Sequence, residues 1–234
     1  MAVDPELADL DPFALFDAEA ARIDAFLATL DDEAWRQPTR CAGWDVHDLT
    51  AHLAATEEYH HACLDDALDT FLARGVAAGA TDVHSFNDLG VRERADRSGP
   101  EIAEEWRHAS AQTRRRFRER ADGTLTTMVG PYPVRAQAIH LASELAVHAD
   151  DMGVPISGED GPSRLAWRTR FARAQLREDK PAVGVDAVDD GTVVRVEGSS
   201  ALLSDADLVD ALNGRLPEDH PLDPAIRAAL DSVP

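Results

Sequence analysis

The sequence of 234 residues has few cysteines and no long apolar run. Cys41 and Cys63 are the only cysteines, and their spacing does not match a zinc knuckle. A reducing compartment would keep them as thiols. No uninterrupted apolar stretch approaches the ~20 residues that a membrane helix needs, and the acidic start, MAVDPELADLDPF, lacks the basic and then apolar pattern of a signal peptide. We therefore expect a cytoplasmic protein with no membrane anchor and no disulfide.

Positive charge is also scarce, because Lys180 is the only lysine and the net charge is −21. Binding to phosphate groups needs clustered positive charge, so nucleic acids and anionic membranes are not expected partners. The sequence contains no G-x-S-x-G, H-E-x-x-H, G-x-G-x-x-G or Walker-type glycine–lysine motif. The common signatures of hydrolases and nucleotide-binding proteins are therefore absent.

The first two-thirds of the sequence has helical periodicity. Apolar residues recur at helical spacing over 11–30, from 45 to about 74, from 100 to about 118, and in a helix that ends at Gly153, with a loop over 75–99. The last third contains two β-branched runs, 182–188 and 192–198, separated by DDG, which predicts a hairpin. We predict a mainly α fold: a four-helix bundle over 1–155 and a small α/β domain over 156–234.

The stretch HLASELAVHADDMG places His140, Glu144 and His148 at four-residue intervals, on one face of a helix. A buried carboxylate there is costly unless a metal ion or a hydrogen bond compensates it. Glu144 and His148 could share an ion with His52 from the second helix, and three protein ligands would leave coordination positions open. His140 lies about 12 Å from His148 along the axis, so one ion could use His140 with Glu144, or Glu144 with His148, but a straight helix cannot offer all three side chains to it. Hydrogen-bonded core histidines are the alternative.

Two segments resemble a known family. WRQPTRCAGWDVHDLTAHLAATEEYH and ELAVHADDMG resemble two blocks of the mycothiol-dependent maleylpyruvate isomerase family, which belongs to the DinB-like four-helix bundles. The resemblance spans residues 10–155. It is weaker in the tail, where VEGSSALLSDADLVDALNGRL is similar to the small C-terminal domain of that family.

The resemblance implies a set of roles. His52, Glu144 and His148 match the three ligands of a divalent metal, usually zinc, and Asp151 matches an aspartate that supports the second histidine. Arg215 falls where the isomerase has a functionally important arginine, so the resemblance makes it our candidate catalytic residue and the one that would attract an anionic substrate such as maleylpyruvate. Mycothiol would be the thiol cosubstrate. In an isomerase its thiolate would add to a conjugated cis double bond and leave after rotation, whereas in a transferase the adduct would be released.

The leading hypothesis is thus a metal-dependent, mycothiol-using isomerase or thiol S-transferase that acts on a small electrophilic substrate. A metal-dependent hydrolase on the same scaffold and a non-catalytic metal- or ligand-binding protein are the alternatives. The expected partners are a small-molecule thiol and a small electrophile, and the protein is expected to be a monomer or a homodimer. The remaining histidines, among them His47, His60 and His61, are expected on surfaces or helix faces. Trp44 is expected to anchor the entry of the second helix.

Overall fold

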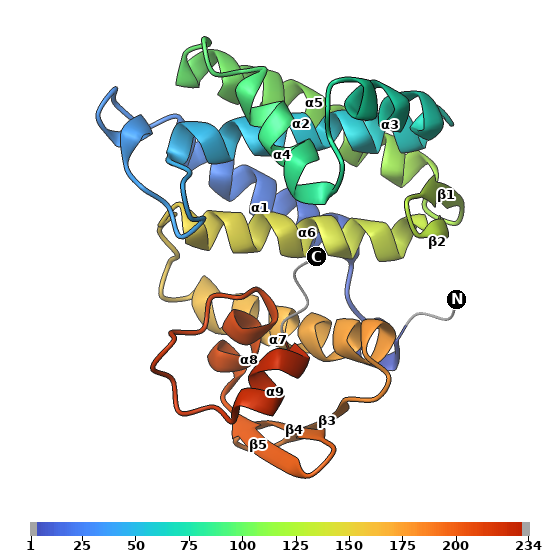
Figure 1. The fold of residues 1–234 in the computed structure, drawn as a ribbon, viewed down its shortest axis with the longest axis vertical. Helices are drawn as coiled ribbons and strands as arrows, with labels where there is room; N and C mark the ends of the chain where they lie inside the picture. The colour runs from blue at the N-terminus through green and yellow to red at the C-terminus, as the bar shows by residue number, and fades with distance from the viewer. Residues whose placement is uncertain (1–3, 231–234) are drawn as a thin grey trace. The chain divides into compact units, whose positions relative to one another are not determined.

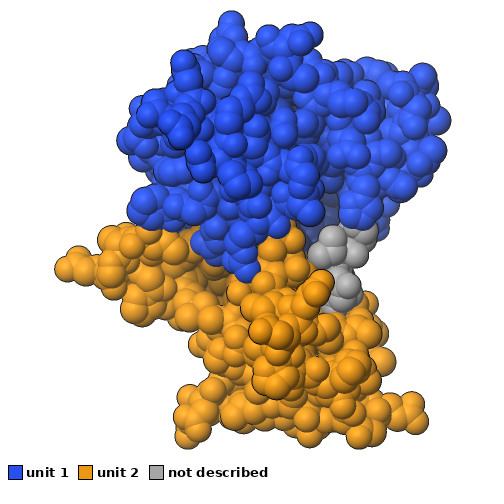
Figure 2. Space-filling model, turned by 60° about the vertical axis from the view of Figure 1, so that its left-hand side comes forward, with its two compact units in different colours: residues 1, 11–155 blue, residues 2–10, 156–234 orange. Residues whose placement is uncertain are grey.

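The computed structural model describes residues 4–230. In chain order its elements are η1 (Pro5–Leu7), α1 (Pro12–Leu27), η2 (Ala34–Arg36), α2 (Val46–Leu64), α3 (Leu68–Ala77), α4 (Val83–Arg92), α5 (Gly99–Glu119), β1 (Thr124–Thr127), β2 (Gly130–Pro133), α6 (Val134–Asp151), α7 (Asp160–Asp179), β3 (Gly184–Val188), β4 (Gly191–Val196), β5 (Ser199–Leu203), α8 (Asp205–Leu212) and α9 (Pro224–Leu230) (Figure 1). The chain divides into two compact units, which are coloured separately in Figure 2.

The first unit is a bundle of the long helices α1, α2, α5 and α6. Helix α1 packs against α6 and α5, and α2 packs against α5, while the shorter α3 and α4 lie against α2 (Figure 1). The core between the helices holds fully buried side chains such as Phe16, Ile23, Leu49 and Trp106. The predicted fold class, a mainly α four-helix bundle followed by a small α/β part, is confirmed.

Local sequence signals set where the bundle helices begin and end. The Asp11 side chain caps α1, and Asp45 and Asp48 cap α2 reciprocally through each other's backbone N–H. Helix α6 is followed by Gly153, whose φ of +72° is a left-handed conformation that glycine adopts without strain. These caps fix the ends of α2 and α6, the two helices that carry His52, Glu144 and His148.

The structure differs from the sequence-based prediction in the middle of the first unit. The helix predicted from 45 to about 74 is divided into α2 and α3, because Asp66 adopts a left-handed φ of +54° that a continuous helix cannot contain. The stretch 75–99 was predicted as a loop but contains α4, which a reciprocal cap between Asp82 and Ser85 begins. The segment with GPYPV forms the hairpin β1–β2, with Met128 and Val129 at its turn.

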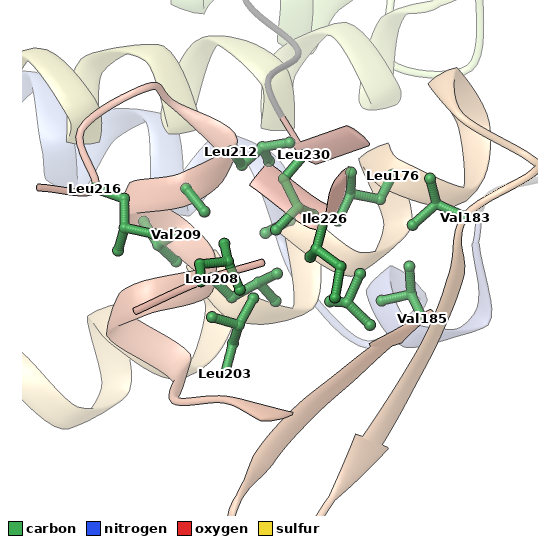
Figure 3. Close-up of a cluster of buried hydrophobic side chains, with 14 residues drawn as sticks. Leu176, Val183, Val185, Leu203, Leu208, Val209, Leu212, Leu216, Ile226 and Leu230 are labelled. Atoms are coloured by element: carbon green, nitrogen blue, oxygen red, sulfur yellow. The ribbon is translucent and has the colours of Figure 1, made fainter. Parts of the chain in front are cut away.

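The second unit contains a three-stranded antiparallel sheet, in the order β3–β4–β5, with helices α7, α8 and α9. Figure 3 shows its core of aliphatic side chains, which come from both the strands and the helices. The predicted DDG hairpin is confirmed, since β3 pairs with β4 around Asp189 and Asp190. Gly191 is required there, because its φ is +137° and a Cβ atom would lie 2.1 Å from the Leu203 carbonyl oxygen.

The first described residues, 4–10, belong to the second unit and not to the bundle. Their carboxylates pair with arginines of α7: Glu6 contacts Arg173 at 2.7 Å and also Arg177, and Asp9 contacts Arg170. We had expected one domain over 1–155, but the structure places 11–155 in the bundle and 4–10 with 156–230. Residues 1–3 and 231–234 of the two expected domains lie outside the described residues.

Within residues 4–230, none of the helices is both long enough and apolar enough to span a bilayer.

The His60 side chain, which is 4% exposed, makes the bundle sensitive to acid. Burial, together with the charge of His61, lowers the pKa of His60 to about 3. In the unfolded chain the pKa is about 6.5, so the neutral ring contributes its full stability above that pH and loses it as the pH falls toward 3. Between pH 6.5 and 4.5 we expect a loss of about 2–3 kcal/mol from this residue. Urea unfolding of wild type and His60→Gln across this range should show their difference shrinking with acidification, and a constant difference would contradict the prediction.

Candidate metal centre

Two helices bring His52, Glu144 and His148 together. His52 lies in the middle of α2, whereas Glu144 and His148 are one turn apart on α6. One possible ligand atom from each of the three lies within 4.8 Å of the others. The His52 Nε2 atom is 3.7 Å from Oε1 of Glu144, and the two imidazole rings meet edge to face with centroids 5.1 Å apart. The side chains are thus close enough to share one ion.

His52 lacks the hydrogen bonds that a buried imidazole normally makes. It is 6% exposed, and its Nδ1 atom has no hydrogen-bond partner among residues 4–230. The 3.7 Å from Nε2 to Glu144 is too long for a hydrogen bond. Burial, and secondly the charge of His148, lowers the pKa of His52 to about 3, so the ring is neutral near pH 7. A neutral imidazole with an unused lone pair is the form that binds a divalent metal.

His148 is oriented by Asp151 at the end of the same helix. The Nδ1 atom of His148 lies 3.2 Å from Oδ2 of Asp151, so an Nδ1–H would donate to this buried carboxylate and leave Nε2 as the second ring nitrogen. Carboxylate partners of this kind fix the tautomer and the ring orientation of metal-binding histidines. The geometry agrees with the supporting role that the resemblance implied for Asp151.

The protonation of the metal-free cluster indicates which positive charge a bound metal ion would replace. Burial raises the pKa of Glu144, although His148 opposes the shift. Burial alone would lower the pKa of His148, but its contacts with Asp151 and Cys41 and the nearby Glu144 raise it to about 9. In the metal-free cluster His148 is therefore protonated near neutral pH, and its Nδ1 atom faces Asp151. A divalent cation would take the place of that proton, so two imidazoles and one carboxylate fit a zinc-type ion.

A loop before α2 forms part of the same region. The ring of Trp44 lies 5.1 Å from that of His52, so Trp44 contacts the cluster and does not only anchor the helix entry.

The backbone N–H of Arg40 donates to the Asp151 carbonyl at 3.1 Å. Cys41 places Sγ 3.2 Å from Oδ2 of Asp151. Cys41 was not among the predicted site residues, because the loop that brings it to α6 shows no periodic pattern in the sequence. Neither Cys41 nor Cys63 is in a disulfide.

His140 makes a different contact. Its Nε2 atom lies 2.9 Å from the hydroxyl of Tyr132 on β2, and the two rings are 5.6 Å apart. His140 is in none of the metal-capable groups found among the described residues.

Arg215 belongs to the second unit, just after α8. Its backbone N–H donates to the Asp210 carbonyl at 2.7 Å, and its Nη1 donates to the Asn213 carbonyl at 3.0 Å. These contacts fold Arg215 back onto the end of α8. Its role as a catalytic residue stays a prediction.

The other histidines differ in part from expectation. His47 is buried, with Nε2 2.8 Å from the Arg97 carbonyl oxygen, and His60 is buried as well, so of the two expected positions, surface or helix face, both residues occupy a buried face of α2. His61 lies on a helix face and contacts the Ala109 carbonyl. Asp45, His47 and Asp48 also come close together, but the cap of α2 accounts for the two carboxylates.

The fold and the cluster together define a class: a helical bundle with a two-histidine, one-carboxylate group between two of its helices and a small α/β unit after it. Residues 16–153 match the sequence profile of the mycothiol maleylpyruvate isomerase N-terminal domain. This match covers more than half of the chain, and the chain belongs to that family.

Individual relatives are more distant. Two uncharacterized proteins from two strains of Mycobacterium tuberculosis are 27% identical over 149 residues, which is 63% of this chain and 57% of each relative. The match therefore spans little more than half of the length of these curated relatives. Crystal structures of the mycothiol-dependent maleylpyruvate isomerase, and of a variant with one histidine replaced by alanine, are similar in fold, with TM-scores of 0.61 and 0.60. They are 14% identical to this chain and cover 87% of it and 88% of their own chains.

Proposed function

We propose that the protein is a metal-dependent, mycothiol-using isomerase or thiol S-transferase that acts on a small electrophile. The observation that carries the proposal is the convergence of His52, Glu144 and His148, in which a buried imidazole has no hydrogen-bond partner in the described chain. Membership of the isomerase family supports the choice of thiol cosubstrate. A fold shared with the mycothiol-dependent enzyme is consistent with this proposal.

Each side chain has a defined part in the proposal. His52 and His148 would supply neutral nitrogen ligands and Glu144 one anionic oxygen, and Asp151 would hold the His148 ring in place. A bound divalent ion, for which zinc is our candidate, would stabilise the thiolate form of the cosubstrate near neutral pH. The half-buried indole of Trp44 would limit access of water beside His52. Arg215 remains our candidate for recognising a substrate carboxylate.

The test combines metal analysis with a thiol-dependent turnover assay. The full chain is stripped with a chelator, divided, and one part is reloaded with Zn²⁺. Both parts are then given an activated cis-alkene such as maleylpyruvate, or an alkyl halide, with and without mycothiol. We expect about one equivalent of zinc and turnover only when both zinc and mycothiol are present. Turnover without the thiol would indicate a hydrolase, and a chain that stays metal-free after reloading would contradict the proposal.

A further inference from the structure

Cys41, His148 and Asp151 form a second group of possible metal ligands beside the first. The Oδ2 atom of Asp151 lies 3.2 Å from Sγ of Cys41 and 3.2 Å from Nδ1 of His148, and Sγ is 4.0 Å from that Nδ1. The group offers one sulfur, one nitrogen and one oxygen. It uses the Nδ1 atom of His148, which is the nitrogen that faces Asp151.

These separations match the spacing of ligands around a tetrahedral ion. Zinc bonds of about 2.1 Å to nitrogen and oxygen and about 2.3 Å to sulfur place the ligand atoms about 3.4–3.7 Å apart. The observed 3.2, 3.2 and 4.0 Å depart from this by only about 0.2–0.4 Å. An ion could therefore enter with small side-chain adjustments.

The backbone holds the group in place. Cys41 lies in a loop in which its own N–H donates to the Thr39 hydroxyl at 3.1 Å, and the preceding residue, Arg40, donates its N–H to the carbonyl of Asp151 at 3.1 Å. The loop is thus attached directly to the residue that shares the group with Cys41. Asp151 is 4% exposed, and a buried carboxylate is stabilised by a nearby cation. Because the loop around Cys41 and the end of α6 are already held together, binding of a metal ion between them would cost less conformational entropy.

We propose that Cys41, His148 and Asp151 are a second cation site, selective for thiophilic divalent ions such as Co²⁺, Cd²⁺ and Zn²⁺. On binding, the bond between sulfur and hydrogen is replaced by one between sulfur and metal, and the bond between Nδ1 of His148 and its hydrogen by one between nitrogen and metal, so that both protons leave to solvent. A neutral imidazole has one lone pair, so His148 can serve this site through Nδ1 or the first site through Nε2, but not both at once. The two sites are therefore mutually exclusive, and the tautomer of His148 selects between them.

The test is a Co²⁺ titration of the full-length, reduced protein, followed by absorption spectroscopy. Thiolate ligation gives a sulfur-to-cobalt charge-transfer band in the near ultraviolet, which nitrogen and oxygen ligands do not give. We expect this band in wild type and its complete loss in Cys41→Ser and in Cys41→Ala. The matched control is Cys63→Ser, because Cys63 is the other thiol and lies buried on α2. Its band should be unchanged.

A second variant separates this site from the proposed function. His52→Ala removes a ligand of the first site only, so it should keep the charge-transfer band even if it loses thiol-dependent turnover. Absence of the band in wild type, its survival in both Cys41 variants, or its loss in His52→Ala would overturn the proposal. Loss in His52→Ala would mean that Cys41 serves the first ion. Failure of the turnover assay alone would leave this site intact, since the readout is spectroscopic.

Discussion

Replacement of His148 by alanine is expected to remove divalent metal from the protein altogether. His148 is the one residue common to the two proposed ligand groups, and its Nδ1 atom is the nitrogen that faces Asp151. Changes to residues that merely orient a ligand cost about 10–100-fold in metal affinity, so loss of the ligand itself should cost more than about 100-fold. Any metal-dependent turnover should fall to the level of the stripped protein.

Equilibrium dialysis against buffered Zn²⁺ measures this effect in His148→Ala. His84→Ala is the matched control, because His84 is an exposed histidine on α4 and belongs to none of the groups of possible metal ligands among the described residues. It should bind zinc as wild type does. Asp151→Asn should fall between the two, with a loss of about 10–100-fold. If His148→Ala retained zinc with wild-type affinity, the ligand assignment would be wrong.

The second large effect is expected in the bundle core, at Trp106. This side chain is 1% exposed on α5, the helix that packs against α1, α2 and α6. Truncation to alanine removes a whole indole from a close-packed interior and leaves a cavity, which costs about 3–5 kcal/mol. Trp106→Phe keeps most of the volume and should cost clearly less.

Urea unfolding monitored by circular dichroism tests the prediction for Trp106. Trp44→Ala is a useful comparison, since Trp44 is only half-buried and lies in the loop before α2. We expect it to lose little stability although its ring contacts His52. Because the chain has two units, each transition should be fitted separately. Equal losses in the two alanine variants would show that α5 is not central to the core.

Helical periodicity in the sequence predicted some features of the structure correctly and carried no information on others. The spacing of Glu144 and His148 placed both on one face of α6, as the structure has them. His52 was a candidate from its place in the second predicted helix, and the family resemblance selected it, because helical periodicity does not say which face of α2 meets which face of α6. The separation of α2 from α3 was missed, since a single left-handed residue, Asp66, leaves the surrounding apolar pattern unchanged.

The contacts made by the loop around Cys41 and by residues 4–10 could not be predicted from periodicity either. Cys41 reaches Asp151 across 110 positions, through a loop with no periodicity of its own. The pairing of Glu6 with Arg173 spans 167 positions and rests on charge complementarity, which in a chain with many arginines and carboxylates does not select a partner. The roles of His52, Glu144, His148 and Arg215 stay predictions until metal and activity are measured.

The pairing of residues 4–10 with α7 has a consequence for biosynthesis. The bundle, 11–155, is an insertion within the second unit, whose first segment is synthesised before the bundle and whose second segment is synthesised after it. Since domains fold as they emerge, the bundle can close early, whereas Asp4, Glu6 and Asp9 must wait for Arg170, Arg173 and Arg177. An expression fragment that begins at residue 11, or one limited to 156–234, would lack the three carboxylates that form ion pairs with these arginines.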